Sequence, residues 1–170
     1  MNKKTLTTQN LVLFALFIAM TVVMTLIIRI PIPFAQGYVN IGDSILLLAG
    51  MLLGPAGGFW IGGIGSALAD LFTGYSFYAP ITFLVKGIEG LLCGWLFMKL
   101  PSTKPLIPAL TAGIWMAVGY VLGDWILFGL AAGLAAFPMN LLQGVVGALM
   151  AVLLHRFIAP VFKNRIHQKS

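Results

Sequence analysis

The stretch that decides the fold lies at residues 42–72 and reads GDSILLLAGMLLGPAGGFWIGGIGSALADLF. It is almost wholly apolar, and Gly54-Pro55 interrupts it. Glycine commonly ends a helix, and proline is tolerated in the first turn of the next one. The pair therefore predicts two helices, over 42–54 and 56–72. The first is short for a membrane span, so it is either tilted or begins earlier, near Tyr38.

The rest of the chain is equally apolar. Of its 170 residues, 60% are hydrophobic and 8% are charged, and the mean hydropathy is +1.02. A soluble domain has roughly 25% charged residues, so this chain cannot cover a water-facing surface and lipid must surround it. Further apolar runs predict helices over 8–28, 80–98, 106–130 and 136–158. The first of these runs is too long for a cleaved signal segment. We expect one all-α transmembrane domain over 1–170, a compact bundle of about six spans.

The basic residues gather at the chain ends and in one connection, at Lys3, Lys4, Lys99, Lys104, Arg156, Lys163, Arg165 and Lys169. Cytoplasmic loops of membrane proteins carry an excess of Lys and Arg. This distribution predicts that both termini are cytoplasmic and that Arg29 lies outside. It also explains the net charge of +6 without a nucleic-acid partner.

Glycines recur at the spacing of helix packing. They form the sets Gly54, Gly58 and Gly62, then Gly90 and Gly94, then Gly119 and Gly123. In lipid, small residues let helix backbones approach closely. We interpret these glycines as helix contacts without a chemical role.

All four acidic residues fall in predicted helices, and their expected depths lie toward the outer half of the membrane. A charge at the bilayer centre costs at least ~2.5–3.5 kcal/mol. Such groups must therefore face one another or a water-filled cavity, which predicts a small-molecule site near the outer surface. The candidate binding residues are Asn40, Asp43, Asp70, Tyr75, Tyr78, Lys86, Glu89, Tyr120, Asp124, Asn140 and Gln143.

Each candidate also has a structural interpretation. Lys86 could pair with Glu89 three residues on, or with Asp70 from another helix. Asp43 could cap the helix that begins at 42. The two amides of the last helix could simply join helices. These alternatives stay open at the level of sequence.

Two predicted outer connections, 29–40 and 73–80, could cover such a cavity. The first contains two prolines, which exclude a regular helix. The second carries Tyr75, Phe77 and Tyr78, whose flat rings could stack on a planar ligand. They could equally be aromatic residues at the headgroup level of the membrane.

The sequence lacks the motifs of common catalytic sites. It contains no phosphate-binding Gly-x-x-x-x-Gly-Lys-Ser/Thr loop and no His-Glu-x-x-His zinc motif. His155 and His167 fall at the cytoplasmic end and in the tail, and Ser66 has no nearby histidine as a base. We expect no enzyme activity, no catalytic residue and no metal site.

Residues 39–58, VNIGDSILLLAGMLLGPAGG, followed by GSALADL at 65–71, resemble the S components of energy-coupling factor (ECF) transporters. These small membrane subunits capture vitamins and vitamin precursors. The likeness covers nearly the whole chain, including its length, six helices, Gly-Pro turn and basic tail. It implies that a vitamin binds from outside, beneath the loop after the first helix.

The same resemblance implies the partners. An S component docks on a transmembrane coupling (T) subunit that two ATPase subunits drive, and it topples to release its cargo. It has no cofactor, because ATP is used by the partners. Ala15 and Ala19 match the Ala-x-x-x-Ala docking motif of the family, and small residues one turn apart allow close helix approach. The expected location is the cytoplasmic membrane.

The branch that the chain resembles most contains riboflavin, hydroxymethylpyrimidine and pyridoxine carriers. Carboxylates, a lysine, amides and tyrosines suit a small planar heteroaromatic ring with hydroxyl or amino groups. We therefore expect a hydroxymethylpyrimidine or B6-type vitamer, ahead of riboflavin and pantothenate. The alternative from another class is a stand-alone secondary carrier or channel, in which Lys86, Glu89 and Asp124 relay protons. It would need an inverted repeat, and the sequence shows no convincing one.

Overall fold

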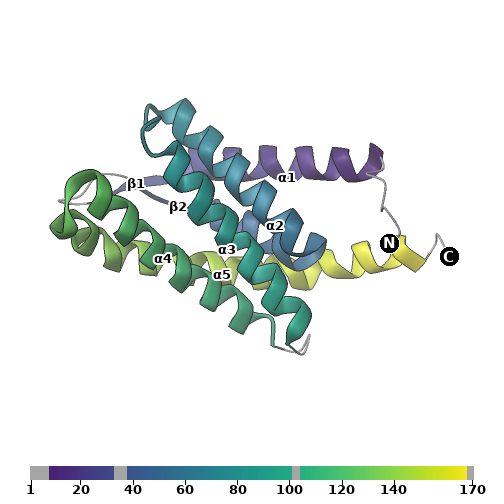
Figure 1. Ribbon diagram of the computed structural model, residues 1–170. Coiled ribbons are helices and arrows are strands. Elements are labelled where there is room, and N and C mark those ends of the chain that lie inside the picture. Colours follow the sequence, from purple (N-terminus) through teal and green to yellow (C-terminus); the bar gives the residue numbers. More distant parts are fainter. Residues whose placement is uncertain (1–7, 33–37, 101–103, 168–170) are drawn as a thin grey trace, which may run out of the picture.

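The computed structural model is almost entirely helical and describes residues 8–32, 38–100 and 104–167 (Figure 1). Within these ranges there are five helices and a two-stranded sheet. The elements are α1 (Thr8–Ile27), β1 (Arg29–Pro31), β2 (Tyr38–Asn40), α2 (Asp43–Thr73), α3 (Ala79–Lys99), α4 (Leu106–Phe128) and α5 (Leu130–His167). In the described part, four helices, α2 to α5, are long and apolar enough to cross a membrane, and α1 has a shorter apolar stretch over Leu11–Ile27.

Helix α2 is two helical segments joined at Gly54. This glycine has φ 79° and ψ −175°, and Pro55 follows it. A Cβ added at Gly58 would lie 3.0 Å from the Cα of Gly50, and one added at Gly62 would lie 3.4 Å from the Cβ of Leu46. The segments therefore run back along each other. The predicted helix end and restart at Gly54-Pro55 are confirmed, and the predicted helices 42–54 and 56–72 are the two segments of α2.

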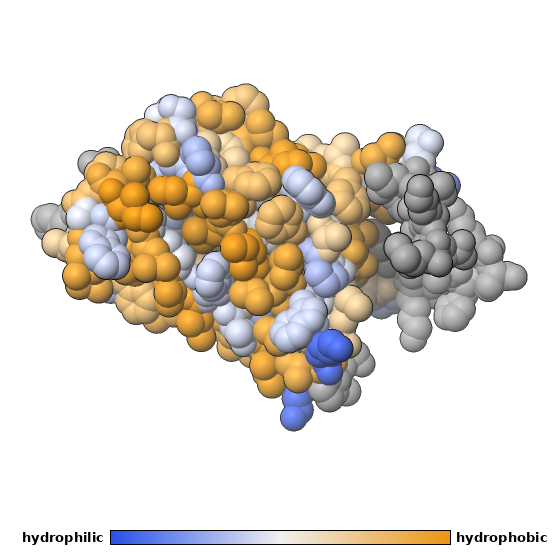
Figure 2. Space-filling view, in the orientation of Figure 1, coloured by the Kyte–Doolittle hydropathy of each residue, from blue (hydrophilic) through white to orange (hydrophobic). Residues whose placement is uncertain are grey.

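The first segment of α2 is the centre of the bundle. Residues 42–51 are all buried. One side contributes Leu46, Leu47 and Met51 to a cluster with Cys93 and alanines of α4 and α5. Another side packs Ile45 and Leu48 against Phe17 and Ile61. The face of the molecule in Figure 2 is largely hydrophobic, as expected for a protein whose solvent is lipid.

The glycine pattern is helix packing, as predicted. A Cβ at Gly58 or at Gly90 would lie 2.2 Å from the carbonyl oxygen of the other residue, so α2 and α3 touch backbone to backbone. A Cβ at Gly94 would lie 2.8 Å from the carbonyl oxygen of Gly50. Gly119 and Gly123 of α4 face side chains of α3 in the same way.

The prediction for the last two helices was wrong at their junction. The expected helices ended at 130 and began at 136, whereas α4 ends at Phe128 and α5 begins at Leu130. Gly129, with φ 93°, makes the whole turn. The alanines after it are strong helix formers, and Pro138 lies inside α5 instead of in its first turn. Membrane helices tolerate such a proline.

The connection after α1 is more regular than predicted. Its ends pair as an antiparallel ribbon, with Arg29 opposite Asn40 and Pro31 opposite Tyr38. Residues 33–37 of this connection lie outside the described residues, as do Lys3, Lys4 and Lys169 among the predicted cytoplasmic cations. The ribbon lies at the end of the bundle opposite to the start of α1 and the end of α5 (Figure 1).

Candidate ligand-binding site

A cavity lies at the ribbon end of the bundle, and every helix and β2 contribute to its wall. Its volume is about 40 Å³, room for about three waters. All the predicted site residues except Asp43 and Glu89 line it. The lining consists of Thr25, Ile32, Tyr38, Asn40, Ser66, Asp70, Tyr75, Tyr78, Thr82, Lys86, Tyr120, Asp124, Asn140 and Gln143.

Sequence reasoning missed several polar members of this wall. Ser66 lies four residues before Asp70, and Thr82 lies four residues before Lys86. Side chains at this spacing share a helix face, so the spacing could have found both. Thr25 of α1 has no such neighbour among the predicted residues. Its hydroxyl is buried and has no hydrogen-bond partner among the described residues.

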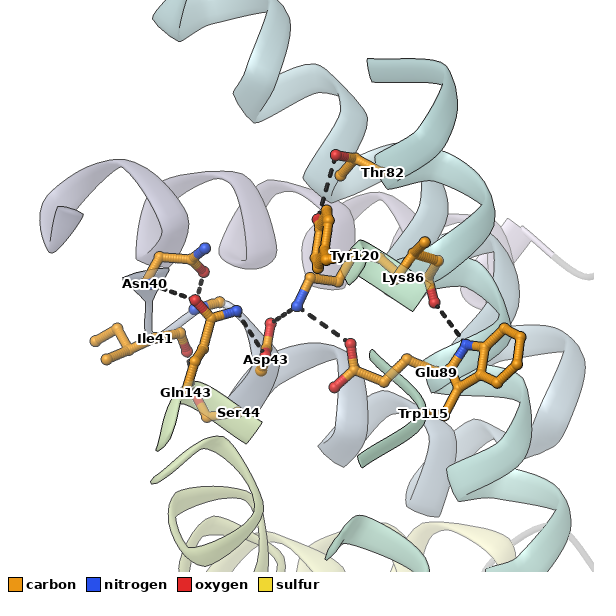
Figure 3. A network of polar contacts seen from close by, with 12 residues as sticks. Asn40, Ile41, Asp43, Ser44, Thr82, Lys86, Glu89, Trp115, Tyr120 and Gln143 are labelled. Carbon is orange, nitrogen blue, oxygen red and sulfur yellow. Dashed lines mark hydrogen bonds and ion pairs between the residues drawn. The ribbon is translucent and has the colours of Figure 1, made fainter. Parts of the chain in front are cut away.

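Beneath the cavity, Lys86 binds two carboxylates (Figure 3). Its Nζ donates to Oδ1 of Asp43 and lies 3.2 Å from Oε2 of Glu89. All three side chains are at most 2% exposed. A buried ion is tolerated only with partners of opposite charge. Asp43 and Glu89 therefore hold the lysine instead of lining the cavity, and Asp70 is not its partner.

Gln143 joins this cluster to the ribbon. Its Nε2 donates to Oδ2 of Asp43 at 2.8 Å, and its Oε1 accepts from the backbone N–H of Asn40 at 2.7 Å. Asp43 is thus engaged by side chains and does not cap α2, whose N-cap is Gly42. Asn140, three residues before Gln143, lines the cavity but makes no hydrogen bond to the described residues. Its amide is free for a ligand.

Two tyrosines of the cavity wall bind carboxylates. Tyr38 donates its hydroxyl to Oδ1 of Asp70 at 2.9 Å, and Tyr78 donates to Oδ1 of Asp124. Burial raises the pKa of both tyrosines above the ordinary value, and the adjacent carboxylates raise it further. Both therefore remain protonated donors. The ring of Tyr75 lies between them, with centroids 5.3 Å from Tyr38 and 6.3 Å from Tyr78.

The aromatic residues at 75–78 divide between the two predicted roles. Tyr78 is buried and points its hydroxyl into the site, while Phe77 is exposed. Tyr75 is half-buried and lines the cavity. The interpretation as membrane-interface aromatics fits Phe77 but not Tyr78.

Comparisons with known proteins identify the family. The sequence profile of the family described as ECF-type riboflavin transporter, S component, matches residues 5–160. The chain belongs to the ECF transporter S components. It is therefore a multi-pass membrane transport protein and not an enzyme.

Individual proteins resemble the chain over most of its length. The chain is 37% identical over 147 residues to an uncharacterised protein of Pyrococcus woesei, covering 83% of this chain and 98% of the other. It is 27% identical over 151 residues to the thiamine precursor transporter HmpT of Lactococcus lactis, covering 88% and 87% of the two chains. A solved S component of a bacterial ECF transporter shares the fold, with a TM-score of 0.73 at 23% identity over 91% of this chain and 98% of the other.

Ala15 and Ala19 of this S component lie on the exposed side of α1. Phe17, between them, is buried against α2. The predicted docking motif is thus available to another helix. Within the described residues, no group of three or more His, Cys, Asp or Glu side chains is arranged to hold a metal ion.

Proposed function

We propose that this S component captures a hydroxymethylpyrimidine or B6-type vitamer for an ATP-driven importer. The observation that carries the proposal is the cavity wall, which combines carboxylates, a lysine, a free amide and four tyrosines around a small space. Planar rings stack on tyrosines, and few but well-placed polar groups determine orientation. The likeness to a thiamine precursor transporter supports the pyrimidine class.

The size of the cavity favours a single ring. At about 40 Å³ it must expand for any vitamin. A larger ligand must displace more side chains of the wall, and each hydrogen bond to a charged group that is broken costs about 1.5–3 kcal/mol. A small ring requires the least expansion. Riboflavin is the second candidate, because the matching family profile is that of riboflavin S components.

The proposed assembly has a T subunit and two ATPase subunits, which use ATP, so this chain needs no cofactor. We place it in the cytoplasmic membrane with both termini inside. Lys104 and Arg156 line one groove near the α4 start, whereas Arg29 lies on the ribbon. This separation of charge supports the orientation by the positive-inside rule.

A ligand panel tests the function. Thermal unfolding of the purified protein in detergent should shift upward with one water-soluble vitamin or precursor. A ligand at ~100 times its Kd stabilises the folded state by about 2.7 kcal/mol. A shift with hydroxymethylpyrimidine or a B6 vitamer supports the proposal. A shift with riboflavin alone supports the second candidate, and no shift with any vitamin contradicts both.

Substitution of Ala15 or Ala19 by tryptophan tests the docking surface. A bulky ring on this exposed face should prevent close approach of the coupling subunit. We expect uptake to fall at least about tenfold in cells that express the whole importer, while ligand affinity of the isolated chain stays unchanged. The matched control is Met20→Trp, also exposed but about 100° around the helix. Equal loss in the control, or lost ligand affinity, would contradict the docking role.

A further inference from the structure

Asp70 has a buried carboxylate oxygen without a partner. The residue lies near the end of α2, is 6% exposed and lines the cavity. Its Oδ1 accepts the hydroxyl of Tyr38, whereas its Oδ2 has no hydrogen-bond partner among the described residues. Glu89 also has buried carboxylate oxygens without a hydrogen-bond partner among the described residues, but Glu89 does not line the cavity. Asp70 is therefore the charged group of this wall with a fully buried free acceptor.

Three strong donors of this wall already bind other carboxylates. Lys86 and Gln143 donate to Asp43, and the Tyr78 hydroxyl donates to another carboxylate. Thr82 faces Asp70 but makes no hydrogen bond to its Oδ2. A water in the small cavity can satisfy this oxygen while no ligand is bound. A ligand that displaces this water must replace its hydrogen bond or lose affinity.

An ionised carboxylate only accepts hydrogen bonds. We propose that Oδ2 of Asp70 accepts a hydrogen bond from an amino group on the ring of the ligand, which makes Asp70 the residue that selects amino-substituted rings over their oxo counterparts. An oxo group would present a lone pair to the carboxylate and leave both groups unpaired in a buried site. The inference rests on the proposed function, because it assumes a small heteroaromatic ligand. Tyr38 donates to the other oxygen, so with one donor from the ligand both oxygens of the carboxylate accept a hydrogen bond.

The test compares two ligands that differ at one group. The probes are 4-amino-5-hydroxymethyl-2-methylpyrimidine and its 4-oxo analogue, titrated against the purified full chain in detergent. Hydrogen bonds to charged groups predict that the wild-type protein prefers the amino compound by about 10- to 100-fold. Asp70→Asn should lose that preference, since its amide can donate to the oxo group. Affinity for the amino compound should fall about tenfold or more, and affinity for the analogue should hold or rise.

Asp124→Asn is the matched control, because Asp124 also lines the cavity and also accepts from a tyrosine. Because Asp124 belongs to the wall, its substitution should lower the affinity for both probes together, while the ratio of the two affinities stays within about threefold of the wild type, a change well below that of one charged hydrogen bond. If Asp70→Asn is not recovered folded, Asp70→Ser replaces it. A retained preference in the Asp70 variant, or an equal loss in the control, overturns the role of Asp70 alone. A wild-type protein that binds the two probes equally also overturns it, and one that binds neither overturns the pyrimidine proposal as well.

Discussion

Replacement of Lys86 by methionine should destabilise the protein by about 3–5 kcal/mol, the cost of leaving buried charge unpaired. Lys86 is the shared partner of Asp43 and Glu89, which are 1% and 0% exposed. Methionine fills a similar volume, so lost packing contributes little. The measurement is the free energy of unfolding in mixed detergent micelles, with helicity followed by circular dichroism.

A triple variant separates charge from packing. Lys86→Met combined with Asp43→Asn and Glu89→Gln removes every charge of the cluster while keeping its shape. Replacing a complete buried ion cluster by neutral groups is often close to neutral in stability. We therefore expect the triple variant to regain most of the loss. A single variant as stable as the wild type, or a triple variant no better than the single, would contradict this account.

Gly90→Ala should cost about 3 kcal/mol or more, at the upper end of the range for overpacking. The added Cβ would lie 2.2 Å from the carbonyl oxygen of Gly58. This atom belongs to the backbone and cannot rotate away, so α2 and α3 must separate. These two helices make the most extensive helix contact of the described structure. Thermal unfolding of the purified variant measures the effect.

Gly74→Ala is the matched control for this prediction. Gly74 ends α2 with φ 83°, and a Cβ there would meet nothing within 4 Å. Alanine disfavours this left-handed backbone conformation, so the substitution should lower the free energy of unfolding by only about 1–2 kcal/mol. If the two variants lose equal stability, the contact between Gly58 and Gly90 is not the reason for the glycine at position 90.

Much of the fold could be predicted from local patterns. The turn at Gly54-Pro55 can be predicted from these two residues alone, because helix termination depends on their own backbone preferences. The junction of α4 and α5 shows the limit of this reasoning. The last helix was expected to begin at 136, but the alanines before that position continue the helix back to Leu130. Membrane burial supports a helix that proline alone would discourage.

The membrane argument also predicted which polar residues gather. Because charges in lipid must face one another or a cavity, Asp70, Lys86, Asp124 and Asn140 were expected together, and the structure brings them to one wall. The individual pairs could not be predicted. Lys86 had two candidate carboxylates in the sequence argument, and its shortest contact is to a third, Asp43.

The apolar segments, the turn at Gly54-Pro55, the glycine contacts and most of the buried polar residues could be predicted from the sequence. These properties follow from composition and from short-range spacing. The pairing of Asp43 and Glu89 with Lys86, and of Tyr38 with one oxygen of Asp70, depends on the tertiary arrangement. So does the lack of a hydrogen-bond partner for the other oxygen among the described residues. Partner choice depends on the register between helices, and close backbone packing at residues such as Gly58 and Gly90 sets that register to within a fraction of a helical turn.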